Sequence, residues 1–118
     1  MANPNIVNVA TINGKTDVFA LTTTETNLVT ATANTVFKIN SIMVSNIDGT
    51  NAADVTIKYN DGSNDRAIAS TISVPADATL AVVDKNSSFY LEENEIIKGT
   101  ASANSDLEGL IAYEIISD

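Results

Sequence analysis

The residues best suited to chemistry are three clustered carboxylates, Glu92, Glu93 and Glu95. A pair of carboxylates can cleave a glycosidic bond, one as the acid and the other as base or nucleophile. Glycoside-cleaving sites also stack sugars on aromatic rings, and this chain has only three tyrosines, three phenylalanines and no tryptophan. The cluster directly precedes Ile96 and Ile97, so we interpret it as a solvated turn that leads into a strand.

Serine and lysine are the remaining candidates for nucleophilic catalysis. The chain contains neither histidine nor cysteine, which removes Ser-His and Cys-His pairs as well as zinc sites built from these residues. Lys85 with Ser87 or Ser88 could form a Ser-Lys dyad, but no oxyanion motif accompanies them. We therefore expect that the protein is not an enzyme and uses no cofactor.

The segment Asp61 to Asp65 is the best candidate for a metal site. Its oxygen ligands at alternate positions resemble the start of a calcium-binding loop. However, Arg66 stands at the sixth position, where that loop needs glycine, and Ile72 stands at the twelfth, where it needs a bidentate acid. A polar hairpin loop with Asx-type hydrogen bonds accounts for the same residues. We expect no metal site, although the sequence leaves open whether this loop takes a cation.

The charge of the chain restricts its partners. Its 118 residues include fifteen acidic and six basic ones, which gives a formal net charge of −9. Proteins bind phosphate backbones mainly through Lys and Arg, so we expect no binding to nucleic acid or to an anionic membrane. The first residues lack the features of a secretory signal, and no apolar run reaches the roughly 18 residues of a membrane span.

Alternation of apolar and polar residues indicates β-strands over residues 54–60 and 66–74. Pro75 has no backbone N–H to donate, so it is expected to close the second of these strands. The residues predicted to face inward are Val55, Ile57, Tyr59, Ile68, Ile72 and Val74.

Two segments earlier in the chain carry turn or bulge signals. Asn13-Gly14 is typical of a type I′ turn and predicts a hairpin between strands over residues 6–12 and 16–22. Residues 36–46 are apolar on both faces, and a bulge near Asn40-Ser41 would explain the change of phase. Burial of both faces is the alternative explanation.

The C-terminal segment could be a helix or a strand. Ser105 and Glu108 could form a capping box that opens a helix. Strict alternation over residues 107–116 favours a strand, and Gly109 would cost a helix about 1 kcal/mol. With further strands expected at 79–85, 88–91 and 96–103, the sequence predicts an all-β, single-domain β-sandwich or jelly-roll-like fold over residues 1–118. It should have eight to ten short antiparallel strands and little or no helix.

Several stretches of turn and strand sequence make the chain similar to a family of small structural proteins of tailed bacteriophages, best known among marine cyanophages. These stretches are residues 3–9, 14–16, 44–50, 54–57, 73–80, 90–95, 101–103 and 112–115. Asn94 stands where relatives often have glycine, and asparagine also tolerates the left-handed conformation of that turn.

The resemblance implies a virion component, with capsid decoration as a cement protein the favoured role. The implied partners are the major capsid protein and further copies of the chain in a homotrimer. The implied location is the outer capsid surface, after synthesis in the host cytoplasm. A neck, tail or fibre component and a glycan-binding module are the alternatives.

Two groups of residues are candidates for the interface. Residues 1–5 are short and polar, and we expect them to form an arm that orders only on docking. Tyrosine suits half-buried contacts, although each tyrosine could instead cap the core with its hydroxyl in water. The candidate interface residues are Asn3, Pro4, Asn5, Tyr59, Tyr90 and Tyr113.

Overall fold

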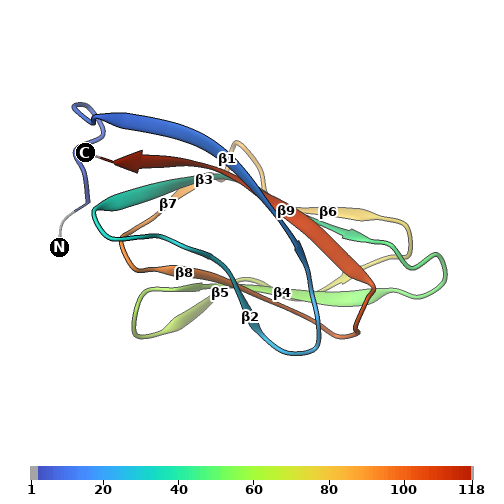
Figure 1. The fold of residues 1–118 in the computed structure, drawn as a ribbon. Helices are drawn as coiled ribbons and strands as arrows, with labels where there is room; N and C mark the ends of the chain where they lie inside the picture. The colour runs from blue at the N-terminus through green and yellow to red at the C-terminus, as the bar shows by residue number, and fades with distance from the viewer. Residues whose placement is uncertain (1–2, 118) are drawn as a thin grey trace.

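The computed structural model describes residues 3–117, which form nine strands and no helix (Figure 1). No segment of these residues is a helix long and apolar enough to cross a bilayer. The prediction of an all-β chain is therefore confirmed. The strands are β1 (Thr11–Ala20), β2 (Thr26–Thr30), β3 (Thr35–Asn46), β4 (Ala53–Asn60), β5 (Asp65–Val74), β6 (Thr79–Val83), β7 (Phe89–Leu91), β8 (Ile96–Ala101) and β9 (Leu107–Ser117).

The strands form two antiparallel sheets packed face to face. Sheet A has the order β1-β9-β3-β6, with β7 also paired to β3, and sheet B has the order β2-β8-β4-β5. Because β6 and β7 lie along the same side of β3, they act as one interrupted strand. Counted in this way, the eight strands have the order of a jelly roll, in which nearly every connection crosses from one sheet to the other.

The core lies between the inner faces of the two sheets. Alternation in β4 follows the prediction, because Val55 and Ile57 are fully buried and Tyr59 is partly buried. Removal of β-branched and aliphatic side chains from water supplies most of the stabilisation of such a sandwich. The largest fully buried side chains are Leu21, Ile39, Ile42, Ile57, Leu91, Ile97, Leu107 and Ile111.

The predicted hairpin at Asn13-Gly14 is wrong. Both residues lie inside β1, which runs without a turn from Thr11 to Ala20 beside β9. Neither residue has the positive φ that a type I′ turn requires. Pairing with β9 along ten residues outweighs the local turn preference of the dipeptide, which is a tertiary effect.

The bulge predicted in the third strand is confirmed. The register between β3 and β9 shifts between Ile39 and Ser41, and Ile39 and Ile42 are both fully buried on either side of the shift. One extra residue therefore lets both halves of a long strand face the core.

Ile72 is not buried as predicted, because the residue is 41% exposed. Ile72 pairs with the fully buried Val55, but β5 is an edge strand whose register shifts directly beside this pair, where Thr71 has a φ of 52°. Val74 is fully buried, and the strand ends there before Pro75, as predicted. The C-terminal segment is a strand, as predicted, so Ser105 caps no helix.

Candidate interface around Tyr90

The N-terminal segment packs on the outer face of sheet A. Val36 and Ile116 pair with each other and are buried, although they lie outside the main core cluster. Pro4 is buried beside them, and Pro4, Ile6 and Val36 line one recess of about 330 Å³. The segment therefore covers a small second apolar cluster on the side of the sheet that faces away from the core.

Hydrogen bonds to the β7–β8 turn hold Asn3 in place. Its side-chain amide donates to Glu92 Oε1 at 2.6 Å, and its Oδ1 accepts from the Glu93 backbone N–H at 3.4 Å. Asn5 forms a local turn, since its Oδ1 accepts from the N–H of Val7 at 3.0 Å. Of the predicted arm, residues 3–5 thus lie against the sandwich, whereas residues 1 and 2 lie outside the described residues.

Tyr90 is the exposed aromatic residue of this surface. It lies on β7 opposite Lys38 and is 42% exposed, while its neighbour Leu91 is fully buried on the core side. Its side chain lines the recess beside Pro4, and the residue also lines a second pocket of about 340 Å³. Tyr90 therefore stands between two apolar depressions, and together they are called the Tyr90 surface below.

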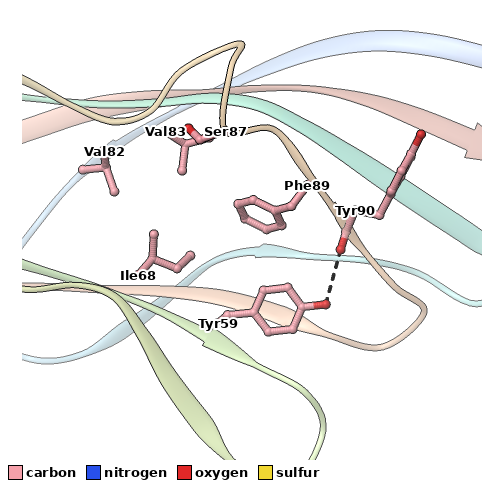
Figure 2. Close-up of a pocket in the computed structure, with 7 residues that line it drawn as sticks. All are labelled: Tyr59, Ile68, Val82, Val83, Ser87, Phe89 and Tyr90. Carbon is pink, nitrogen blue, oxygen red and sulfur yellow. Dashed lines mark hydrogen bonds between the residues drawn. The ribbon is translucent and has the colours of Figure 1, made fainter.

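The second pocket opens at the side of the sandwich, where β5 and β6–β7 are the edge strands. Figure 2 shows Tyr59 and Phe89 facing each other across it, while the ring of Tyr90 points away. The rings of Tyr59 and Phe89 have centroids 5.7 Å apart and are tilted by 55°. The remaining lining residues are Ile68, Val82, Val83 and Ser87.

The hydroxyl of Tyr59 is committed to hydrogen bonds at the rim of this pocket. It donates to the Glu95 carboxylate and lies 3.4 Å from the Tyr90 carbonyl oxygen. Burial, followed by the interaction with the Glu95 carboxylate, raises the pKa of Tyr59. The group therefore remains a neutral donor at physiological pH, and the pocket offers apolar contact with a polar rim.

The sequence predicted that the three clustered glutamates lie in a solvated turn. In the structure, each of them also connects the β7–β8 turn to another segment. Glu92 accepts from Asn3, Glu93 accepts from the backbone N–H of Asn34, and Glu95 accepts from Tyr59. Backbone N–H groups and side-chain donors bound to carboxylates give relatively strong, charge-assisted hydrogen bonds. The cluster thus fixes the position of the Tyr90 surface. The spacing of the glutamates alone could not reveal this role, because their partners are distant in sequence.

The β7–β8 turn also has the predicted backbone conformation. Asn94 has a φ of 65°, in the left-handed region, and the N–H of Glu95 donates to the Glu92 carbonyl at 3.0 Å. Asparagine is thus accepted where glycine would be equally suitable.

Tyr113 lies apart from the other candidate residues. Its side chain is 4% exposed in the core and its ring stacks on Phe37 at a centroid distance of 5.1 Å. The hydroxyl donates to Asp17 Oδ2 at 2.6 Å. Burial, followed by the interaction with Asp17, raises the pKa of Tyr113. The structure therefore brings Asn3, Pro4 and Tyr90 together, adds Tyr59 through the second pocket, and leaves Tyr113 in the interior.

The Asp61–Asp65 loop has the hydrogen bonds of an Asx-type hairpin. Asp61 Oδ1 accepts from the N–H groups of Ser63 and Asn64 at 3.0 and 2.8 Å, and these bonds lower the pKa of Asp61. Asp65 accepts from the Asn60 side chain at 2.7 Å. Residues 3–117 contain no group of three acidic residues arranged to hold a metal ion. In the possible Ser-Lys dyad, the Ser87 hydroxyl accepts a hydrogen bond from the Asp84 N–H at 3.0 Å and so stabilises a local turn.

These features define a jelly-roll domain with a small apolar, tyrosine-bearing surface that is a candidate interface. Two solved structures resemble the chain in fold. A chain from the disulfide-linked pili of Bacillus endospore appendages has a TM-score of 0.54 and 13% identity, and the match covers 92% of this chain and 88% of that chain. A chain from the acid-stable capsid of the Helicobacter pylori bacteriophage KHP30 has a TM-score of 0.53 and 8% identity, with coverages of 92% and 89%.

No protein-family model and no curated protein matches the sequence. At such low identities, the two structural matches show a shared fold. Both matches come from structural assemblies, a pilus and a phage capsid. The resemblance to cyanophage proteins stays a prediction.

Proposed function

We propose that this chain is a structural virion protein that decorates the outer surface of a capsid as a cement protein. The fold-level match to a phage capsid chain over 92% of this chain is the observation that carries the proposal. The match to a pilus chain supports the broader structural role. In this proposal the chain is made in the host cytoplasm, binds the major capsid protein and performs no catalysis.

The Tyr90 surface is the proposed contact with the capsid. An exposed aromatic ring between two apolar depressions can bury apolar area with little loss of side-chain entropy. Asn3, Glu92 and Glu95 hold this surface in one conformation through the bonds described above, which lowers the entropic cost of binding. We expect the partner to insert apolar side chains and to place basic groups near the glutamates.

The number of copies per particle tests whether the protein decorates the capsid. Quantitative mass spectrometry of purified virions should find the chain at a copy number comparable to that of the major capsid protein. A handful of copies would instead indicate the neck, tail or fibres. Absence from the particle would overturn the proposal, and binding on a glycan array would then support a glycan-binding module.

A pair of variants tests the contact itself. Tyr90→Ala should weaken sedimentation of the protein with capsids about ten-fold, since an aromatic anchor is worth more than 1 kcal/mol in many interfaces. Ile72→Ala is the matched control, because Ile72 is 41% exposed and Tyr90 is 42% exposed. Equal binding by both variants would place the contact elsewhere on the molecule.

A further inference from the structure

The four edges of the two sheets differ in how they are protected from pairing with another chain. β2 and β6 have five residues each and one register shift each, while β7 has three residues. β5 has ten residues and two register shifts. β1 also has ten residues, but it pairs with β9 at every position without a shift. Short strands and bulges disfavour edge-to-edge pairing, so β1 is the one long, regular edge in residues 3–117.

The backbone of β1 has hydrogen-bonding groups directed away from the sheet. Leu21, just beyond β1, donates to the Leu107 carbonyl at 2.9 Å and continues the β1–β9 register. Because bonded pairs alternate along an antiparallel ladder, the even-numbered residues of β1 present their N–H and C=O groups to the open edge. No turn or loop in residues 3–117 uses these groups. The central residue of this open row is Thr16.

We propose that β1 pairs antiparallel with β1 of a second copy, with Thr16 opposite Thr16 on a two-fold axis. This arrangement joins the two A sheets into one continuous sheet. Each even-numbered residue then forms a bonded pair with an even-numbered residue of the second copy, as the direction of the open groups requires. A two-fold contact is self-complementary, so one strand supplies both sides of the interface.

The charges of β1 favour this register. Lys15 and Asp17 are the charged residues of the strand, and their side chains lie on the same face, 3.6 Å apart from Nζ to Oδ1. With Thr16 on the axis, Lys15 lies opposite the second copy's Asp17, and this pair occurs twice. Shifting the axis by one residue would place Lys15 opposite Lys15 or Asp17 opposite Asp17. Opposite charges across strands stabilise pairing and like charges oppose it.

Gly14 gives a second, independent argument. Glycine weakens a strand interior and often marks a close approach of another backbone. Gly14 does not have a positive φ, and a side-chain carbon built on it would have no neighbour within 4 Å. The fold of one copy therefore gives no reason for a glycine here. In the proposed register, Gly14 lies opposite the second copy's Val18, which is 81% exposed in the single chain, so pairing removes part of this apolar side chain from water.

The inference concerns association of the free protein and stands without the proposed function. A two-fold pair differs from the homotrimer implied by the resemblance, and it occupies a different strand from the Tyr90 surface. Its test therefore uses purified protein without capsids, so either proposal can fail alone.

Sedimentation of the full chain over a range of concentrations should show a reversible monomer–dimer equilibrium. Lys15→Glu places a carboxylate opposite the second copy's Asp17 and should raise the dimer Kd about ten-fold or more. Arg66→Glu, on the β5 edge, changes the net charge equally and should leave the Kd within about two-fold. A monomer at all concentrations, a trimer, or equal effects of the two variants would overturn the inference.

Mixing two charge variants tests the register. The Lys15→Glu chain and an Asp17→Lys chain each have like charges opposite one another when they pair with themselves. Together they form two attractive pairs, so the mixture should dimerise at least ten-fold more tightly than either variant alone. Unfolding of each variant is measured in dilute solution to confirm that it folds. A mixture no tighter than its components would exclude this register.

Gly14→Val separates the interface from the stability of the single chain. The added side chain meets open space within one copy, so the unfolding midpoint of the dilute protein should stay the same or rise. Dimerisation should tighten about three-fold or more, because a valine opposite the second copy's Val18 forms an apolar cross-strand pair on each side of the axis. Unchanged dimerisation would show that Gly14 does not face a second copy.

Discussion

β1 and β5 are edge strands of equal length in the same sandwich, yet their backbones differ. β1 follows β9 with one register over ten residues, whereas β5 changes register twice beside β4. In β5, Thr71 has a φ of 52° and donates its N–H to Thr56 Oγ1 at 3.0 Å. Bulges turn an edge away from incoming strands. The difference shows that the two edges are distinguished by backbone geometry rather than by length.

The regularity of β1 depends on what lies beneath it. Phe19 of β1 pairs with Gly109 of β9, and its ring lies over the glycine. Tyr113, two pairs further along the ladder from Asp17, donates to the Asp17 carboxylate. An aromatic ring placed over a glycine of the neighbouring strand is a known way to hold register. β1 is thus held by contacts on its inner face, whereas β5 is shaped by its own bulges.

Gly109→Ala should have the largest effect. A methyl group at this position overlaps the Met43 carbonyl oxygen and the Phe19 ring, so the backbone of β3 or β9 must move. We expect a loss of about 3 kcal/mol or more in the free energy of unfolding, as for other overpacked interior sites. Urea unfolding of dilute protein measures it, with Gly14→Ala as the control that should not destabilise. Similar losses for both variants would contradict the role assigned to Phe19 and Gly109.

Loss of the tyrosine hydroxyls should have an intermediate effect. Tyr113→Phe leaves Asp17 without its tyrosine donor, and Tyr59→Phe does the same to Glu95, so each should cost about 1 kcal/mol at neutral pH. Hydrogen exchange should quicken in β1 for Tyr113→Phe but not in β5 for Tyr59→Phe. Equal loosening of both edges would remove the proposed difference between them.

The pH dependence follows from the same bonds. The folded state raises the pKa of Tyr59 and of Tyr113, so it favours their neutral forms. Their contribution is complete below the unfolded tyrosine pKa of about 10 and declines as the pH rises above it. The decrease in the free energy of unfolding between neutral and alkaline pH should therefore be smaller in either phenylalanine variant. Tyr90→Phe is the control, and a profile altered equally by it would contradict this assignment.

Replacement of Thr71 should have the smallest effect. A β-branched residue in the left-handed region is strained, and asparagine tolerates that conformation better. Thr71→Asn should therefore raise the free energy of unfolding by about 0.5 to 1 kcal/mol. Thr26→Asn, at an exposed position of β2, should instead lower it by about 0.5 kcal/mol through reduced strand preference. A loss at both positions would mean that Thr71 is not strained.

The sequence by itself determined most strands, because alternation and turn chemistry are local. The burial of Val55 and Ile57, the strand end before Pro75 and the left-handed Asn94 all follow from preferences of a few neighbouring residues. These signals predicted an all-β sandwich and favoured a strand over a helix at the C-terminus. They also named Tyr90, although not the two depressions beside it.

Only the tertiary structure decided which local preferences prevailed. Asn13-Gly14 lies in an extended strand because β9 bonds to it. Ile72 is exposed although it pairs with the buried Val55, because it lies on an edge strand with no further strand beside it. Asn3 and Pro4 gain their place from Glu92 and Val36, which lie far along the chain. Each outcome depends on partners that meet only after folding, and no window of neighbouring residues contains them.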